Sequence, residues 1–435
     1  MKSIKNYIIL STLLFVFSCS EKSSLQTDIS SESSVISSSD LDNTPIITQN
    51  NSVKLLTDGD QIFPEVFKVI DSAQKKIFVT TYLFGESIGR KISEKLVEKK
   101  KQGLEVQFIA EKSMGTIPEL VSSAKKEYDF MIKNGVDVRY FPVDKLPKGP
   151  TFLSNRKVIS HAKLIIADDE TAIMGGMNLK DSESINHDYM VLLKGDSVKE
   201  LSKIADENYS KAPNLVVKSN KKDLAGNDTV ELAQTGFGSQ SIDNLMLQKI
   251  NQAQKSIDIE MLLIDYKPIV DALTEAKKRG VEVRVIVDEA DIGKYNKILD
   301  KLPIEGLANF GSVMLLDEVG IPVKWYVPQK KDQVLHAKVM IIDNKTMVMG
   351  SANMTYHALT RNHEIAIAHN DQEAISKFLT TFNDDWATKS KKVELTSTQK
   401  LIGKLFRKIQ GWIYQNKTES QIIEEVHRTI KENKQ

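Results

Sequence analysis

Residues 161–178 (HAKLIIADDETAIMGGMN) and residues 336–353 (HAKVMIIDNKTMVMGSAN) share one pattern. Each stretch begins with a histidine, has a lysine two residues later and an aspartate five residues after the lysine, and ends in Gly-[Gly/Ser]-x-Asn. The two histidines lie 336 − 161 = 175 positions apart. Because spacing is repeated together with composition, the chain is predicted to contain two copies of one structural unit.

The pattern predicts a β-hairpin that carries reactive groups at its base. A histidine and a lysine two residues apart on a strand point to the same face, since side chains alternate along a strand. Apolar residues follow each lysine, and the aspartate then indicates a tight turn into a second strand. That strand returns an asparagine beside the histidine and lysine, and an amide can donate to an oxygen. The expected sets are His161, Lys163 and Asn178 in the first hairpin, and His336, Lys338 and Asn353 in the second.

These residues resemble the phospholipase D superfamily, whose mark is two H-x-K-x4-D motifs in one polypeptide. The resemblance covers roughly residues 51 to 390, and Tyr82-Leu83-Phe84, Gly89-Arg90-Lys91 and Leu146-Pro147 are most similar to its cardiolipin synthase and phospholipase D branch. It implies that Asp188 and Glu364 are acids that bond the histidines. It also implies that Asp168 and Asp343 are structural and lie away from the phosphate. One departure is visible, because Gly176 stands where the second copy has Ser351.

The expected fold class is α/β, with two pseudo-symmetric phospholipase D-type halves packed to form one central active site. A strand, a helix that ends at a glycine and a further strand precede each motif, which predicts parallel strands covered by helices. No dimer is required, because one chain carries both motifs. The predicted boundaries are residues 1–18 for a signal peptide, 19–50 for a lipidated disordered tether, 51–215 for half 1, 216–230 for a linker, 231–390 for half 2 and 391–435 for an amphipathic helical tail.

The amino terminus predicts export. Two lysines precede the apolar stretch from Tyr7 to Phe17, and Cys19, the single cysteine of the chain, follows it. These features are typical of a signal peptide and resemble a bacterial lipobox, so Cys19 is the expected lipidation site; the alternative is an incidental cysteine. We expect an exported, membrane-anchored lipoprotein of a bacterial cell envelope, on its periplasmic or surface face. The apolar stripe within residues 400–413 is either a second membrane contact or a face packed against the domain.

Charge gives no sign of a polyanion partner. Removing residues 1–18 leaves 59 − 2 = 57 basic and 58 acidic residues. A nearly neutral chain has no global field for nucleic acid, which is therefore not favoured as a partner. The expected partners are a phospholipid substrate and the membrane, and no protein partner is obligatory.

Two imidazoles, two lysines and two amides predict a site for a phosphodiester. The lysines and amides would orient and neutralise the nonbridging oxygens. One imidazole can attack phosphorus to give a phosphohistidine, while the other protonates the leaving alcohol and later deprotonates the acceptor. By resemblance His161 is the nucleophile and His336 the acid and base, although the residues alone do not order them. The histidines without a lysine partner are expected to tolerate replacement better: His187, His357, His363 and His369.

The favoured function is a phospholipase D-type phosphodiesterase that hydrolyses the distal phosphodiester bond of phospholipids. Three alternatives follow it: a cardiolipin synthase-like phosphatidyltransferase, a secreted endonuclease, and a non-catalytic surface lipoprotein that binds lipid or a partner. No cofactor is expected, and no metal, because a lysine two residues from each histidine would oppose a cation.

Overall fold

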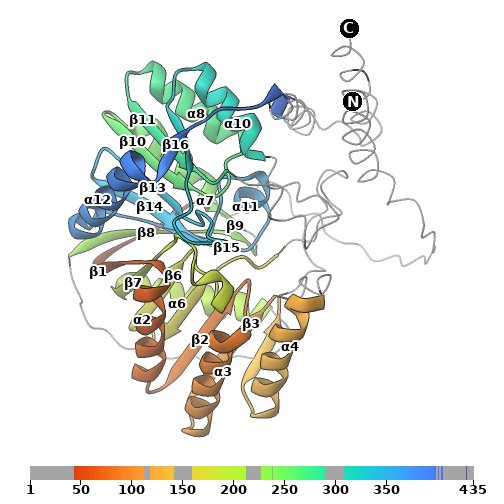
Figure 1. The fold of residues 1–435 in the computed structure, drawn as a ribbon. Helices are drawn as coiled ribbons and strands as arrows, with labels where there is room; N and C mark the ends of the chain where they lie inside the picture. Colours follow the sequence, from red (N-terminus) through yellow and green to blue (C-terminus); the bar gives the residue numbers. More distant parts are fainter. Residues whose placement is uncertain are drawn as a thin grey trace, which may run out of the picture.

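The computed structural model describes residues 44–111, 118–141, 159–211, 227–237, 239–289 and 308–397, together with isolated positions near the carboxyl end. The predicted signal peptide, Cys19, most of the predicted tether, Leu146-Pro147 and nearly all of residues 400–413 lie outside this part of the chain. The described residues form two similar α/β halves, as predicted (Figure 1).

Half 1 runs from β1 to α6. Its elements are β1 (Ile46–Thr57), α2 (Asp58–Ser72), β2 (Lys76–Thr81), α3 (Glu86–Lys101), β3 (Glu105–Ala110), α4 (Pro118–Lys133), β4 (Asp137–Tyr140), β5 (Leu164–Ala167), β6 (Thr171–Gly175), the short 3-10 helix η4 (Asp181–Glu183), β7 (Tyr189–Gly195) and α6 (Asp196–Lys211).

Half 2 repeats this order with small additions. Its elements are β8 (Asp228–Gly236), β9 (Ser239–Gln240), α7 (Ser241–Gln252), β10 (Ser256–Met261), α8 (Lys267–Lys278), β11 (Glu282–Val287), α10 (Ala308–Glu318), β12 (Val323–Tyr326), β13 (Lys338–Ile342), β14 (Thr346–Gly350), α11 (Tyr356–Thr360), β15 (Glu364–His369), α12 (Gln372–Thr388) and β16 (Ser390–Lys392).

All described strands join one sheet whose order is the same in both halves when read outward from the centre. The order is β16-β12-β11-β10-β13-β14-β15-β8-β1-β7-β6-β5-β2-β3-β4, with β9 paired to β8. β1 and β8 pair antiparallel at the junction between the halves. In each half the β-α-β units are parallel, β2 with β3 and β10 with β11, whereas the motif hairpins β5-β6 and β13-β14 are antiparallel. The motifs therefore occupy equivalent places on either side of the junction.

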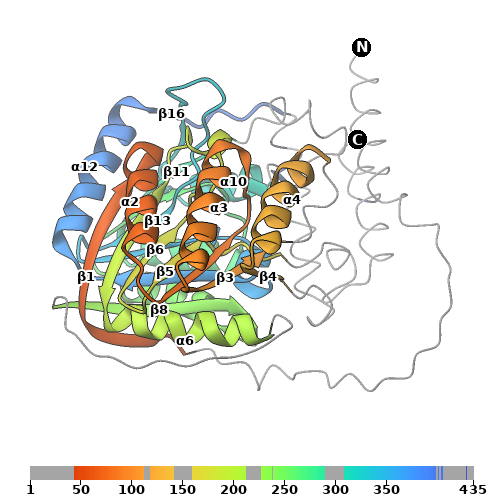
Figure 2. The same ribbon diagram turned by 90° about the horizontal axis from the view of Figure 1, so that it is seen from below.

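Helices cover the outer faces, and the inner faces of the two halves share a core. Figure 2 shows α2, α3 and α4 side by side over half 1, and their apolar residues pack on the outer face of its strands. α7, α8 and α10 cover half 2 in the same way. The third core contains side chains of both halves together with those of α6 and α12. α6 contacts β8, and α12 contacts β1, so each carboxyl-terminal helix reaches the other half.

Local sequence explains where the covering helices stop. α3 and α8 end before Gly103 and Gly280, whose φ angles of 93° and 91° lie in the left-handed region that glycine adopts most easily. The predicted glycine caps are therefore present at both positions.

Three predicted boundaries differ from the structure. Residues 46–50, assigned from the sequence to the tether, form the start of β1, because this segment pairs with β8 and Thr48 donates its hydroxyl to the carbonyl of Val230 at 2.9 Å. β8 begins at Asp228, inside the predicted linker. β16 extends half 2 to Lys392, since it pairs with β12.

In the part of the chain that the structure describes, no helix combines the length and the apolar character that crossing a bilayer requires.

Candidate active site

Each motif hairpin is held by the aspartate at its turn. Asp168 and Asp343 have φ angles of 57° and 55°, and the residues that follow them are also left-handed, as in the turns that suit two-residue hairpins. The Asp168 carboxylate accepts backbone N–H groups of Gln74, Lys75 and Lys76 at 2.7, 2.7 and 2.9 Å. Asp343 binds residues 254–256 in the same way. Both aspartates thus tie the hairpin to the preceding helix–strand junction.

The histidines stand at the base of the hairpins. His161 precedes β5, and His336 precedes β13, so the sequence-based placement of both histidines within a regular strand was wrong by a few residues. Their backbone partners belong to the opposite half: the N–H of His161 donates to the carbonyl of His363 at 2.8 Å, and that of His336 to the carbonyl of His187 at 2.8 Å. The motif segments are therefore held by contacts across the junction.

The acids also contact the histidines across the junction between the halves. His161 of half 1 has Nδ1 at 3.0 Å from Oε2 of Glu364 in half 2, and 3.1 Å from the carbonyl oxygen of Ser351. His336 of half 2 has Nδ1 at 2.6 Å from Oδ2 of Asp188 in half 1. Since Nδ1 faces acceptors in both pairs, it carries the hydrogen in the neutral ring, which leaves the Nε2 lone pair for a substrate.

Gly176, which stands where the second copy has Ser351, changes the surroundings of Asp188 in the Asp188–His336 pair. In half 2 the Ser351 hydroxyl donates to Oε2 of Glu364 at 2.5 Å. In half 1 a Cβ added at Gly176 would lie 2.2 Å from Oδ1 of Asp188. The shorter acid of half 1 therefore fills the space that a serine side chain would need, and Asp188 has no hydroxyl donor from this position.

The lysines bond to the backbone of the motif histidines, and the two asparagines differ in their bonding. Each lysine donates to the carbonyl of its own histidine, Lys163 at 2.6 Å and Lys338 at 2.5 Å. Asn178 donates to Glu183 at 3.2 Å. The Oδ1 atom of Asn353 is buried and has no hydrogen-bond partner among the residues that the structure describes. The two predicted amides are therefore in different bonding states.

Burial sets the protonation of these groups. It lowers the pKa of Lys163 to about 7 and that of Lys338 to about 8. It also lowers the pKa of both histidines, with His336 falling well below 6.5, and the nearby lysines add to this. The charges of Lys163 and Lys338 act on both histidines, which places all four side chains in one site. A buried pair of lysines held partly neutral gains full charge when an anion enters.

The acids differ in charge. Burial raises the pKa of Asp188 to about 7, although the lysines oppose this. Burial alone would also raise the pKa of Glu364, but His161, Lys163 and the Ser351 hydroxyl lower it below its ordinary value. Glu364 is therefore the firmly ionised acid of the two.

Sequence reasoning missed several residues of the site. The Tyr82 ring lies 4.9 Å from the His161 ring, and the Lys163 ammonium lies 5.5 Å from the Tyr82 centroid. Glu183 accepts from Asn178 and acts on the pKa of both lysines. Tyr82 appeared only as part of a family resemblance. Glu183 has no acidic counterpart in the second copy, so the repeat could not reveal it.

A second pair of acids was detectable. Glu111 and Asp288 each follow the apolar strand of a β-α-β unit by one residue in the sequence. Glu111 accepts the N–H of Ser160, and Asp288 accepts that of Leu335 at 2.8 Å, so each holds the residue before a motif histidine. Aligning the two halves at these strands would have shown the acids in register.

Two histidine–acid pairs joined to two lysines define an enzyme that handles phosphodiesters. Comparison with known proteins agrees with this class. The family model described as "Cardiolipin synthase, PLD-like domain" matches residues 66–209 and 246–386, and the chain belongs to this family.

The chain is similar to curated cardiolipin synthases over about three quarters of its length. The chain is 28% identical over 355 residues to the probable cardiolipin synthase YwiE of Bacillus subtilis (strain 168), covering 78% of this chain and 67% of that protein. It is 27% identical over 352 residues to the cardiolipin synthase of Clostridium perfringens (strain 13 / Type A), covering 76% and 69%. The crystal structure of phosphatidylserine synthase from Haemophilus influenzae Rd KW20 has the same fold, with a TM-score of 0.63, 13% identity and coverage of 87% of this chain and 97% of that one.

These findings confirm the phospholipase D superfamily and overturn the favoured reaction. The sequence predicted a hydrolase of lipid degradation, but the relatives are named cardiolipin synthases, and a cardiolipin synthase is a phosphatidyltransferase. The error has a physical cause: water and an alcohol attack the same phosphohistidine, so the motif residues do not distinguish the two acceptors.

Proposed function

We propose that the protein is a phosphatidyltransferase of the cardiolipin synthase type. It would move the phosphatidyl group of one phospholipid to a head-group hydroxyl of a second, and phosphatidylglycerol is the proposed donor and acceptor. The observation that carries this proposal is the pair of crossed histidine–acid contacts, His161 with Glu364 and His336 with Asp188. They place two oriented imidazoles in one buried site, as a two-step transfer needs.

The first step would form the covalent intermediate. Nε2 of His161 attacks phosphorus, a P–N bond forms, and the P–O bond to the glycerol head group breaks. His336, which becomes protonated on Nε2 when the anionic phosphodiester enters the buried site, gives that proton to the leaving oxygen. In the second step a hydroxyl of another phosphatidylglycerol gives its proton to His336 and attacks phosphorus. The P–N bond breaks, and cardiolipin leaves.

The lysines would supply the charge for both steps. Lys163 and Lys338 are buried, and the entering phosphodiester restores the protonation that burial opposes. Fixed donors aimed at the nonbridging oxygens stabilise the charge that develops at phosphorus. The proposal therefore needs no metal at the reacting phosphate.

Product analysis tests this function. The full chain, purified in detergent, is mixed with phosphatidylglycerol micelles, and the lipids and free glycerol are measured by mass spectrometry. Cardiolipin and glycerol should appear in equal amounts. His161→Ala and His336→Ala should form neither, whereas His369→Ala, a matched change at a histidine near Met347 on the far part of β15, should keep activity. Phosphatidic acid as the sole product, or no product, would overturn the proposal.

We also propose that lipidated Cys19 holds the enzyme at its substrate membrane. Several acyl chains on one residue bind firmly, whereas a single chain binds marginally. Cys19→Ser should release the protein from the membrane fraction without impairing the purified enzyme. A chain truncated after residue 395 is the matched comparison. If the Cys19 variant still sediments with membranes and the truncated chain does not, the tail is the anchor.

A further inference from the structure

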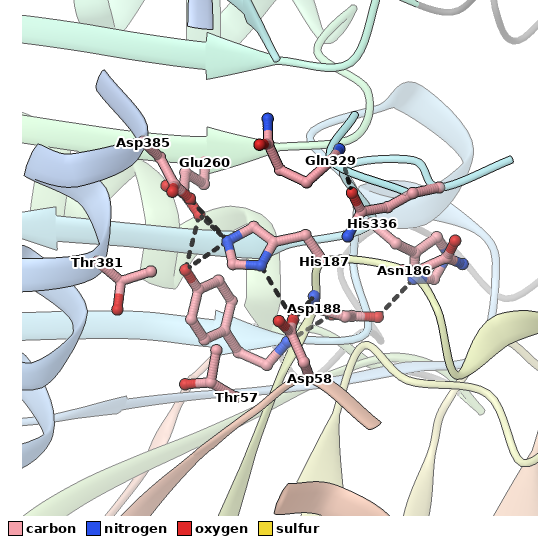
Figure 3. Close-up of polar contacts among 12 residues, drawn as sticks. Thr57, Asp58, Asn186, His187, Asp188, Glu260, Gln329, His336, Thr381 and Asp385 are labelled. Atoms are coloured by element: carbon pink, nitrogen blue, oxygen red, sulfur yellow. Dashed lines mark hydrogen bonds and ion pairs between the residues drawn. The ribbon is translucent and has the colours of Figure 1, made fainter. Parts of the chain in front are cut away.

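His187, outside the two motifs, is buried among carboxylates (Figure 3). Its Nδ1 lies 2.9 Å from Oδ1 of Asp58. Its Nε2 lies 2.9 Å from Oδ2 of Asp385 and 3.5 Å from Oε2 of Glu260. The Tyr189 hydroxyl is 2.9 Å from the same Nε2 and donates to Glu260 at 2.9 Å. Both ring nitrogens thus face carboxylate oxygens. Oδ2 of Asp385 is at ion-pair distance and has no other partner among the described residues, so a charged, doubly protonated ring suits this arrangement best.

The carboxylates come from both halves. Asp58 begins α2 in half 1, whereas Glu260 lies on β10 and Asp385 on α12 of half 2. Two further groups bear on the cluster: Lys389 donates to Oδ1 of Asp385 at 2.8 Å, and the Tyr326 ring stacks on the imidazole at 5.5 Å between centroids. A positive ring at this place therefore joins the two halves through charge as well as packing.

The equivalent histidine of half 2 has neutral surroundings. His363 has Nδ1 at 3.1 Å from the Ser160 hydroxyl, and Asn208 of α6 donates to its Nε2 at 3.1 Å. Phe141 stacks on its ring, and Phe237 meets it edge-on. Asn208 of α6 thus contacts Nε2 of His363, whereas Asp385 of α12 lies beside Nε2 of His187.

Protonation should follow these surroundings. Burial lowers the pKa of His363 to about 4. Burial acts on His187 in the same direction, but the hydrogen bonds with Asp385, Asp58 and Glu260 outweigh it and raise the pKa well above 6.5. At neutral pH one of these related histidines is charged and the other is not.

The cluster is connected to catalysis through the backbone. Asp58 accepts the N–H of Asp188 at 3.1 Å with the same Oδ1 that faces His187, and its own N–H donates to the carbonyl of Asp188 at 2.9 Å. The carbonyl of His187 accepts the N–H of His336, and the N–H of His187 donates to Val334 at 3.0 Å. These bonds fix both members of the Asp188–His336 pair.

We propose that His187 is a positioning residue held as an imidazolium, which joins Asp58 of half 1 to Glu260 and Asp385 of half 2 and so holds Asp188 against His336. This proposal differs from the expectation from sequence that His187 tolerates replacement better than the motif histidines. The ligand atoms of His187, Glu260 and Asp385 lie within 4.8 Å of one another, which a divalent cation could also bridge. A second proton on the His187 ring is favoured over a divalent cation, because Nδ1 and Nε2 are both at hydrogen-bond distance from carboxylates.

The first experiment reads protonation directly and does not depend on the lipid reaction. The full chain, labelled with 15N-histidine, is titrated by NMR, and His187→Gln and His363→Gln assign the two signals. His187 should stay doubly protonated well above pH 6.5, while His363 stays neutral at pH 6. Asp385→Asn, which copies Asn208, should lower the His187 pKa, and Asn208→Asp should raise that of His363. A neutral His187 at pH 7, or one equivalent of bound metal in the purified protein, would overturn the proposal.

The second experiment reads positioning and rests on the proposed transferase activity. His187→Gln should lower kcat about tenfold or more with little change in KM, because a small displacement at a reacting group is costly. His369→Gln, at a buried histidine whose ring contacts Met347, is its matched control. The wild-type rate should fall as alkaline pH removes the His187 proton. Asp385→Asn should move that fall to lower pH while the protein remains folded by circular dichroism. An unmoved alkaline limb would contradict the positioning role even if the transferase is confirmed.

Discussion

The two half-sites keep the same skeleton and differ in charge. In both, an aspartate at a hairpin turn ties the motif to the preceding strand, and a histidine pairs with an acid of the opposite half. Half 2 contributes Ser351 and an ionised Glu364 to His161. Half 1 contributes Gly176 and Asp188, with a pKa of about 7, to His336. Geometry is therefore retained between the halves, whereas the electrostatic surroundings of each histidine have diverged.

This difference supports separate roles for the histidines. A nucleophile needs a fixed tautomer, and the firmly ionised Glu364 with its serine donor fixes that of His161. An acid that titrates near the working pH can share a proton with the histidine it contacts. Asp188, with a pKa of about 7 and Oδ2 at 2.6 Å from Nδ1 of His336, can do so. The asymmetry thus favours His161 as nucleophile and His336 as acid and base.

Replacing either motif histidine should have the largest effect. His161→Ala and His336→Ala should each lower the transfer rate by at least about 10² to 10⁴, the usual contribution of a single acid or base. Only His336→Ala should still form a phosphohistidine, since it keeps the nucleophile. After reaction with radiolabelled substrate and quenching, acid-labile and acid-stable phosphoryl adducts of each variant can be distinguished. A variant that retained more than about a hundredth of the rate would refute the two-histidine mechanism.

The acids should then separate the two roles by pH. Glu364 raises the pKa of His161, so Glu364→Gln lowers it. Because the nucleophile must be unprotonated, the rate rises as pH passes this pKa, and the acid limb should move to lower pH with a smaller plateau. Asp188→Asn is the matched change in the other pair and should lower the plateau without moving that limb. The reverse pattern in kcat profiles would exchange the roles of the two histidines.

The sequence predicts the parts of the site that recur locally. The hairpins, their turn aspartates and the lysines follow from spacing within one copy, and the two acids follow from the family resemblance. The crossed pairing does not, because it depends on how the two copies pack. The contacts of His187 are still harder to predict from the sequence. Asp58 and Asp385 are 385 − 58 = 327 residues apart, and only the fold brings them together. Start positions such as that of β1 depend on pairing with a distant strand rather than on composition.

Exchanging small residues beside the acids should have intermediate effects that differ between halves. Gly176→Ala forces Asp188 to move, because the new Cβ would meet its Oδ1 at 2.2 Å. The transfer rate should fall about 10- to 100-fold, as displaced catalytic groups usually cause. Ser351→Ala removes one donor from Glu364 and should cost about tenfold, the value of one hydrogen bond to a charged group. Equal losses in both variants would mean that the two pairs are equivalent after all.

The turn aspartates should have the smallest effect on the reaction and a similar effect in both halves. Asp168→Ala and Asp343→Ala each remove the acceptor of three backbone N–H groups that water can partly replace, so each should lower the free energy of unfolding by about 1 to 2 kcal/mol. Denaturant unfolding measures this change, and kcat at a temperature well below unfolding should stay within a few-fold of wild type. These side chains face the start of β2 and of β10 rather than the histidines. A loss of kcat comparable to that of the histidine variants would place them in the chemistry, and a loss in one half alone would show that the hairpins, too, have diverged.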